Sequence, residues 1–307
     1  MQAMLLAAGF GTRLRPYTLI RPKPLFPVCT RPLIYILLDM LREAGCRRTV
    51  VNCHYLADQV QAALQGMDDV FLQYESEILG TGGSLRRALD RLDDRPVLVM
   101  NGDIFHTVDL EAVYRYHCLS GNRVTLVLHD YPRFNRVQIR GDRVVGFGEN
   151  SRVSDPRMLA FTGIHVLEPE VIKRIPGSGF FHIIELYQEL AVTGEGIGCL
   201  RVDGCYWRDI GTPEDYLQLH RELLGGSPVP QVEGVAGDLC PRIADGWCLG
   251  REVRLGPGVR LEKWGSLGDH VLVGAGARLS GCVVWDGAEV EPGAACWNLI
   301  ITPPTDC

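Results

Sequence analysis

Residues 6–18 read LAAGFGTRLRPYT and follow an apolar run that we expect to form the first strand of a sheet. A glycine-rich turn after a strand lets backbone N–H groups approach phosphate oxygens closely. Arg13 stands in this stretch, and Lys23 lies ten residues further on between two prolines. Two cations beside such a turn could offset the negative charge of a triphosphate, which increases on the leaving group during the reaction. The stretch does not match the P-loop pattern G-x-x-x-x-G-K-[ST], so ATPase-type hydrolysis is not favoured.

The first two thirds of the chain alternate between short strand-like runs and helical patterns. We expect strands at residues 49–52, 97–101 and 123–128, a hairpin at 137–147, and helices at 32–44, 58–64, 84–92 and 213–224. A further helix should begin after Asp109 as N-cap and end at Gly121. Strands separated by helices predict an α/β fold with a Rossmann-like, doubly wound sheet that is mixed but mainly parallel. Ligands of such sheets lie beyond the carboxyl ends of the strands.

The character of the sequence changes at the Gly/Pro-rich residues 225–230, GGSPVP. Beyond them aliphatic residues recur at every sixth position. One series is Leu249, Leu255, Leu261, Leu267, Val273, Leu279 and Trp285, and a second is Val253, Val259, Val271, Ala277 and Val283. This period predicts a β-helix of hexapeptide rungs. We therefore expect a catalytic domain at residues 1–225, a linker at 226–233 and a small β-helix domain at 234–307.

Composition narrows the classes of partner and compartment. The chain has 307 residues and a formal net charge of -6, with its Lys and Arg residues scattered, which argues against nucleic acid as the partner. No apolar stretch is long enough to span a membrane, and the N-terminal sequence has no signal-peptide pattern. Eleven dispersed cysteines without a C-x-x-C pair predict free thiols in a cytoplasmic protein.

Five blocks, in this order, resemble the signature of the sugar-1-phosphate nucleotidyltransferases, the family that includes mannose-1-phosphate guanylyltransferases. They are residues 6–25, EILGTGG at 77–83, NGD at 101–103, FTGI at 161–164 and WRDIGTP at 207–213. The resemblance spans roughly residues 1–223, and the six-residue repeat is similar to the C-terminal left-handed β-helix that many of these enzymes carry. It implies an enzyme that joins a nucleoside triphosphate to a sugar-1-phosphate and releases pyrophosphate.

The resemblance also implies four catalytic residues. Arg13 would hold the β- and γ-phosphates, and Lys23 would lie against the phosphates near the reacting centre. Asp103 and Asp209 would bind Mg²⁺, a hard cation that prefers oxygen ligands. Taken alone, Asp103 would more often be a turn-forming residue after a strand, and Asp209 an N-cap near the helix at 213–224.

The binding residues follow from the same blocks. The nucleotide-binding residues would be Leu6, Ala7, Ala8, Gly9, Gly11, Thr12, Arg13, Lys23, Glu77, Gly80, Thr81, Gly82 and Gly102. The sugar-binding residues would be Glu149, Thr162 and Gly163. The family commonly has Lys directly after this Glu, whereas this chain has Asn150. Either another cation such as Arg152 or Arg157 substitutes, or the sugar phosphate is held differently.

Two further aromatic residues receive no catalytic role. His182 lies between two apolar groups, and we expect a partly buried histidine with its polar atoms satisfied. Trp207, beside the proposed metal ligand, is expected to pack there and not to stack on the nucleotide base.

Several functions stay open from the sequence. The 79–82 loop favours GTP with mannose-1-phosphate or a heptose-1-phosphate, and the alternative is a uridylyltransferase acting on an amino-sugar phosphate such as N-acetylmuramic acid 1-phosphate. A non-catalytic regulatory subunit is an alternative of another class. A bifunctional acyltransferase is disfavoured, because acyltransferase β-helices usually need more rungs and a trimer with a catalytic histidine. His270 is the only histidine of the C-terminal repeat. We expect a homo-oligomer, assembled through the β-helix, whose end rungs must be capped or paired.

Overall fold

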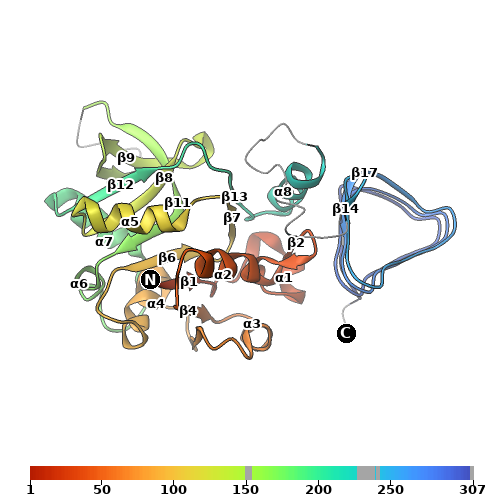
Figure 1. Ribbon diagram of the computed structural model, residues 1–307, viewed down its shortest axis with the longest axis horizontal. Coiled ribbons are helices and arrows are strands. Elements are labelled where there is room, and N and C mark those ends of the chain that lie inside the picture. The colour runs from red at the N-terminus through yellow and green to blue at the C-terminus, as the bar shows by residue number, and fades with distance from the viewer. Residues whose placement is uncertain (149–153, 227–238, 240–242, 305–307) are drawn as a thin grey trace. The chain divides into compact units, whose positions relative to one another are not determined.

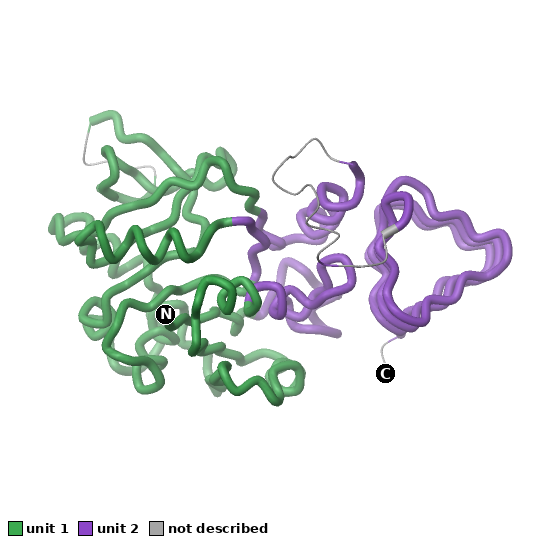
Figure 2. The backbone as a smooth tube through the Cα atoms, in the orientation of Figure 1, with its two compact units in different colours: residues 1–9, 38–102, 108–207 green, residues 10–37, 103–107, 208–307 purple. Residues whose placement is uncertain are grey.

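The computed structural model describes residues 1–148, 154–226, 239 and 243–304, and these form two compact units (Figures 1 and 2). Unit 1 comprises residues 1–9, 38–102 and 108–207, and unit 2 comprises residues 10–37, 103–107 and 208–307. Most of the expected linker lies outside the described residues. The predicted division at residues 225 and 234 therefore stays a prediction.

Unit 1 is built on a nine-stranded sheet with the order β5-β4-β1-β6-β11-β8-β12-β10-β9. Its strands are β1 (Gln2–Leu6), β4 (Arg48–Cys53), β5 (Val70–Tyr74), β6 (Val97–Asn101), β8 (Val124–His129), β9 (Asn135–Arg140), β10 (Arg143–Phe147), β11 (Arg157–Leu167) and β12 (Ile197–Arg201). Its helices are α3 (Ala57–Leu64), α4 (Gly80–Ala88), α5 (Leu110–Ser120), α6 (Pro169–Ile172) and α7 (Ile183–Thr193), while α2 (Leu33–Glu43) belongs to both units. The expected strands and the β9–β10 hairpin are confirmed.

The sheet is mixed, and only part of it is parallel. Strands β5, β4, β1 and β6 pair in parallel, as do β8 and β12. Strand β11, which the sequence analysis did not assign, runs antiparallel to both β6 and β8. A parallel neighbour needs a long crossover connection, whereas β11 comes soon after the β9–β10 hairpin and pairs antiparallel with β9. The expectation of a mainly parallel sheet therefore holds for strands β5, β4, β1 and β6 and for the β8–β12 pair, and it does not hold for the rest of the sheet.

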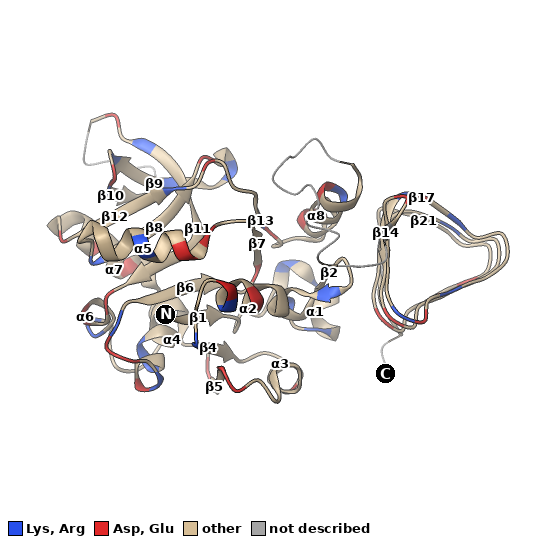
Figure 3. Cartoon of the chain, viewed as in Figure 1, with Lys and Arg blue, Asp and Glu red and all other residues tan. Residues whose placement is uncertain are grey.

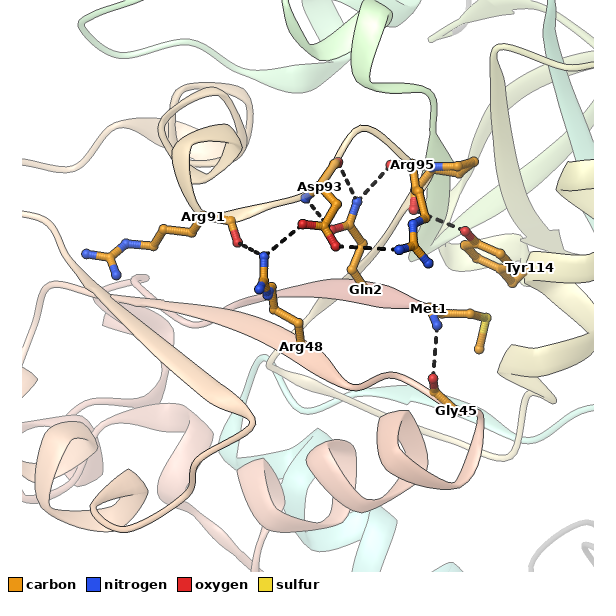
Figure 4. A network of polar contacts seen from close by, with 9 residues as sticks. Met1, Gln2, Gly45, Arg48, Arg91, Asp93, Arg95 and Tyr114 are labelled. Atoms are coloured by element: carbon orange, nitrogen blue, oxygen red, sulfur yellow. Dashed lines mark hydrogen bonds and ion pairs between the residues drawn. The ribbon is translucent and has the colours of Figure 1, made fainter.

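A polar network fixes the amino-terminal ends of these parallel strands (Figure 4). The buried Gln2 side chain donates from Nε2 to the carbonyl oxygens of Asp93 and Arg95, at 2.9 and 2.8 Å, and its Oε1 accepts from the Asp93 N–H. Arg48 on β4 donates to the Asp93 carboxylate at 3.0 Å. The network thus joins the amino-terminal ends of β1 and β4 to the segment before β6, at the opposite end of the strands from their carboxyl ends.

Local sequence signals predicted the start of α5 correctly, but they misplaced the start of α4 and the environment of His182 before α7. Asp109 caps α5 as expected, its Oδ1 accepting from the Ala112 N–H at 2.9 Å, and Gly121 ends the helix with φ 70°. Helix α4 begins at Gly80, earlier than the expected Ser84. His182 is exposed and is the N-cap of α7, its Nδ1 accepting from the Ile184 N–H, so the expectation of a partly buried histidine is wrong.

The C-terminal part of unit 2 is a stack of parallel coils. Its strands are β14 (Ile243–Ala244), β15 (Trp247–Leu249), β16 (Arg254–Leu255), β17 (Arg260–Leu267), β18 (Leu272–Val273), β19 (Arg278–Val284), β20 (Glu289–Val290), β21 (Ala295–Trp297) and β22 (Ile300–Ile301). Leu249 on β15 pairs with Leu267 on β17, and Leu261 on β17 pairs with Leu279 on β19. The two members of each pair are three steps apart in the six-residue series. One coil of the stack therefore accommodates three six-residue rungs.

The last part of the predicted six-residue register is wrong. The coil after Leu267 is one residue shorter than the preceding one, so Val284 occupies the position beside Leu267 and joins the interior cluster. Trp285, predicted for the interior column, is fully buried but contacts the Phe26 ring outside the coil at 4.8 Å. Val283 is also absent from the interior cluster. Leu255 is 46% exposed, because β16 is an edge strand and its column is covered on one side only.

The rest of unit 2 contains β2 (Pro27–Val28), β3 (Arg31–Pro32), β7 (Ile104–His106), part of β13 (Trp207–Asp209), α1 (Tyr17–Ile20) and α8 (Pro213–Leu224). Thr212 is the N-cap of α8, its hydroxyl accepting from the Asp215 N–H at 3.1 Å. Asp209 is therefore not the cap of this helix.

Three general expectations can be compared with the described residues. Figure 3 shows Lys and Arg interspersed with Asp and Glu on the helices and loops and along the C-terminal coil, as the scattered charges of the sequence predict. None of the helices described between residues 1 and 304 has the length and apolar character that a membrane crossing requires. Eight cysteines are free thiols, Cys29, Cys46, Cys53, Cys118, Cys199, Cys205, Cys282 and Cys296. Cys248 is disulfide-bonded, so the expectation of free thiols throughout is wrong at this position.

His220 on α8 holds the segment that follows Lys23. It is fully buried, its Nε2 accepts from the Cys29 N–H at 3.0 Å, and its Nδ1 donates to the Tyr216 carbonyl at 2.9 Å. Burial lowers the pKa of His220 from 6.5 to about 4. The neutral imidazole is therefore part of the folded structure.

We predict that His220 makes folding stability depend on pH between about 4 and 6.5. In this window the unfolded chain binds the proton and the folded chain does not, so stability is complete above pH 6.5 and falls as the pH falls. The wild-type protein should lose on the order of 3 kcal/mol relative to His220→Gln across the window. Urea unfolding of both proteins measures this, and parallel pH curves would contradict it.

Candidate active site

Strand pairing brings two distant carboxylates together. Strand β7 pairs with β13 in a two-stranded sheet, and the Ile210 N–H donates to the carbonyl oxygen of Asp103 at 3.1 Å. Asp103 directly precedes β7, and Asp209 is the last residue of β13. The sheet therefore places the two aspartates side by side in unit 2.

The Lys23 ammonium forms ion pairs with both of these carboxylates. It begins a short 3₁₀ turn, Lys23–Leu25, between Pro22 and Pro24, and it is buried. Its Nζ is 2.7 Å from Asp103 Oδ2 and 3.4 Å from Asp209 Oδ1. Arg13, in the turn Thr12–Leu14, places Nη2 3.7 Å from Asp209 Oδ2 and stays largely exposed. The structure thus brings the four predicted catalytic residues into one cluster.

The electrostatics of the cluster are balanced. Burial raises the pKa of the Asp209 carboxyl, the charge of Lys23 opposes this, Asp103 adds to it and Arg13 opposes it. Two carboxylates, one ammonium and one guanidinium have formal charges that cancel. Arg13 is the exposed member, so it can turn toward an anionic ligand without leaving a buried charge unpaired.

The two carboxylates fit a divalent cation. Their oxygens already converge on one positive group, and carboxylate oxygens are the ligands that Mg²⁺ prefers. Within the described part of the chain, no group of three or more His, Cys, Asp and Glu residues could hold a metal. A cation at Asp103 and Asp209 would therefore depend on substrate oxygens and water for its other ligands, as Mg²⁺ commonly does.

Gly211 leaves room for this cluster. A Cβ at this position would lie 2.6 Å from Asp209 Oδ2 and 2.7 Å from Arg13 Nη2. Both neighbours are the ends of flexible side chains, so a methyl group would displace the ion pair without disturbing the backbone.

In unit 1 a buried network supports the start of the glycine-rich turn. The Ala7 N–H donates to Asn52 Oδ1 at 2.7 Å, and Asn52 Nδ2 donates to Glu75 Oε1 and Ser84 Oγ, both at 3.0 Å. The sequence analysis missed Asn52, Glu75 and Ser84. A polar residue that ends an apolar strand, such as Asn52, is the signal that could have found this network.

Two glycines of the signature blocks, Gly11 and Gly102, stand where the backbone turns tightly or approaches another segment closely. The Gly102 N–H donates to the Leu6 carbonyl at 2.8 Å, and a Cβ on Gly102 would lie 2.9 Å from that oxygen. Gly11 has φ 61°, and its carbonyl accepts from the Thr18 hydroxyl at 3.0 Å. The predicted residues Gly9 and Thr12 are exposed, and Ala8 is half-buried.

The predicted base-binding residues lie in the first turn of α4. The Gly82 N–H donates to the Phe181 carbonyl at 2.9 Å, and Thr81 Oγ1 accepts from the Ile183 N–H at 3.1 Å. A Cβ on Gly80 would lie 2.7 Å from the Phe181 carbonyl oxygen. These residues therefore have a packing reason of their own, and their nucleotide contacts stay a prediction. Glu77 is exposed before the turn.

The predicted sugar-binding residues are only partly described. Glu149, Asn150 and Arg152 lie outside the described residues. The Thr162 hydroxyl is buried and donates to the Val127 carbonyl at 2.8 Å, and Gly163 has φ 79°. Arg157, one candidate replacement for the usual lysine, lies 3.6 Å from Asp130.

Trp207 packs as expected. Its Nε1 donates to the Thr162 carbonyl at 2.8 Å, and its ring lies 4.8 Å from His129 and 5.6 Å from Tyr131 between centroids.

The fold and the charge cluster define a class of protein, and comparison with known families agrees. The model of the nucleotidyl transferase family matches residues 2–225, so the chain belongs to that family. The chain is 32% identical to a mannose-1-phosphate guanylyltransferase of Mycobacterium tuberculosis over 303 residues, covering 95% of this chain and 82% of that protein. It is 27% identical to a UTP–glucose-1-phosphate uridylyltransferase of Synechocystis, covering 96% and 85%. The protein is thus a sugar-phosphate nucleotidyltransferase.

A solved structure has the same fold. HddC from Yersinia pseudotuberculosis superposes with a TM-score of 0.59 at 23% identity, covering 71% of this chain and 97% of that one.

We predict that Gly211→Ala lowers turnover without unfolding the protein. The added methyl group would push Asp209 and Arg13 apart, which removes charge positioned for the reaction, and we expect a loss of roughly 10- to 100-fold in kcat. Pyrophosphate release measures kcat, and the thermal unfolding midpoint reports the fold. Gly204→Ala is the control, because a Cβ there meets nothing within 4 Å. Equal kcat in both variants would contradict the role given to this cluster.

Proposed function

We propose that the protein transfers GMP from GTP to a sugar-1-phosphate, either mannose-1-phosphate or a heptose-1-phosphate, and releases pyrophosphate. The observation that carries the proposal is the similarity of nearly the whole chain to a mannose-1-phosphate guanylyltransferase. The similarity to a uridylyltransferase over a comparable length keeps UTP, with a sugar-1-phosphate such as an amino-sugar phosphate, as the second candidate.

In the proposed reaction a phosphate oxygen of the sugar-1-phosphate attacks the α-phosphorus of the triphosphate in line. A new P–O bond forms there, the bond from the α-phosphorus to the bridging oxygen breaks, and pyrophosphate leaves with its electron pair. The attacking oxygen is already anionic at neutral pH, so neither a covalent enzyme intermediate nor a general base is needed. Catalysis therefore rests on positioning and on neutralising charge.

Two cations of the chain would carry this neutralisation. Arg13 is exposed at the rim of the cluster and would contact the β- and γ-phosphates, where the charge of the leaving group develops. Lys23 is buried on the two aspartates and would hold their oxygens in place while lying near the reacting phosphate. Loss of either cation would leave the cluster with an excess of negative charge facing an anionic substrate.

We further propose that Asp103 and Asp209 hold Mg²⁺. When bound, the ion would offset the charge of the phosphates and orient their oxygens. The two carboxylates would keep the ion beside Lys23.

The proposal also covers the residues that would contact the nucleotide and the sugar, the C-terminal domain and the compartment. Leu6 to Gly9, Gly11, Thr12, Glu77, Gly80 to Gly82 and Gly102 would contact the nucleotide, and Glu149, Thr162 and Gly163 would contact the sugar. The C-terminal coil would be a left-handed hexapeptide β-helix that supports a homo-oligomer, and the enzyme would work in the cytoplasm. These assignments rest on the signature residues and on the six-residue period.

Pyrophosphate release with Mg²⁺ tests the function across a matrix of triphosphates and sugar-1-phosphates. We expect release with GTP and mannose-1-phosphate or a heptose-1-phosphate. Release with UTP and an amino-sugar phosphate alone would replace the guanylyl assignment with the uridylyl one. A folded protein that binds a nucleotide but releases no pyrophosphate with any pair would instead support the regulatory subunit.

We predict that Asp103→Ala removes metal-dependent turnover and leaves the fold intact. The variant loses one of two carboxylates, and kcat should fall by at least about 100-fold, because the lost interaction acts on the charge of the transition state. Asp142→Ala, in the exposed turn between β9 and β10, is the control and should match the wild type. Normal activity of Asp103→Ala at every Mg²⁺ concentration would refute the metal assignment.

A further inference from the structure

The C-terminal coil of unit 2 contacts the segment that precedes Lys23. The Arg21 guanidinium forms a bidentate pair with Asp286, with Nη2 2.7 Å from Oδ2 and Nη1 3.3 Å from Oδ1. Its central carbon also lies 4.8 Å from the centre of the Trp285 ring. Arg21 is thus held by a fork-like ion pair and by a cation–π contact, and it stands two residues before Lys23.

The same tryptophan holds the segment that follows Lys23. Phe26 is fully buried, and its ring packs edge-on against Trp285 at 4.8 Å and against Tyr216 at 5.5 Å. Trp285 Nε1 donates to the Tyr216 hydroxyl at 3.3 Å, and that hydroxyl donates to the Pro27 carbonyl. The C-terminal stack of coils therefore contacts the chain on both sides of Lys23.

The outward position of Trp285 results from the coil's length. In a coil of three full six-residue rungs this tryptophan would occupy the interior column of Leu267. The shorter coil puts Val284 there and leaves Trp285 outside the interior cluster, against Phe26. The irregular step in the repeat thus creates the contact with the segment that carries Lys23.

We propose that Trp285 and Asp286 are positioning residues for Lys23. The C-terminal stack of coils would then hold the catalytic cluster in place, in addition to supporting an oligomer. This rests on the proposed function, in which Lys23 and its two aspartates form the reacting centre. Pro22 and Pro24 stiffen the segment between Arg21 and Phe26, so a shift at either anchor moves the ammonium. A displacement of about 1 Å in such a group can cost about 100-fold in rate.

The test compares Asp286→Asn with Asp269→Asn. Both changes remove a carboxylate that pairs with an arginine, but Asp269 pairs with Arg251 within the coil, at 2.7 Å. We expect Asp286→Asn to lower kcat by about 3- to 10-fold with little change in either KM, because the substrates still bind while Lys23 is misplaced. Asp286→Glu keeps the carboxylate and should recover most of the loss, and Asp269→Asn should match the wild type.

Hydrogen–deuterium exchange of residues 21–28 gives a second readout that does not need activity. Asp286→Asn and Trp285→Phe should both speed exchange of this segment, whereas Asp269→Asn should not. Unchanged exchange and unchanged kcat in Asp286→Asn would overturn the inference, as would an equal effect of Asp269→Asn. If the wild type releases no pyrophosphate with any substrate pair, the proposed function fails, and the exchange result still decides whether the coil holds this segment.

Discussion

The ion pair of Lys23 with Asp103 and Asp209 is the interaction on which the rest of the candidate site depends. A buried ammonium is costly unless it is paired, and two adjacent carboxylates repel each other unless a cation lies between them. Each member of the cluster thus requires the others. The pairing of β7 with β13 brings the two carboxylates together, and Gly211, which carries no side chain, leaves room for Asp209 and Arg13.

The sequence blocks that form this cluster are also places where the chain changes unit. Three of its five crossings between units, at residues 9–10, 102–103 and 207–208, fall inside a signature block. In unit 1 these blocks are anchored by backbone and buried polar contacts, such as those of Gly102 with Leu6 and of Ala7 with Asn52. Gly102 is therefore needed for close backbone approach, in addition to any contact with a nucleotide.

Much of this organisation could be predicted from local signals. The Asp109 cap, the β9–β10 hairpin and the helix after Pro32 each depend on residues within a few positions of one another, and the four catalytic candidates came from a resemblance that fixed their identities. Long-range pairing could not be predicted in the same way. The antiparallel course of β11 depends on which strands it meets, and the support of Ala7 by Asn52 and Glu75 joins three separate elements. The shift at Trp285 was hidden because a one-residue change in coil length leaves a six-residue period that still looks regular.

We propose that Asp103 and Asp209 form one cation site beside Lys23. Titration with Mn²⁺ in the presence of a non-hydrolysable GTP analogue, followed by electron paramagnetic resonance, measures binding at this site. The wild type should bind a single Mn²⁺ per chain more tightly than the free analogue does, and the folded Asp103→Asn/Asp209→Asn double variant should lose this gain. Unchanged Mn²⁺ affinity in the double variant would show that these two aspartates do not hold the cation.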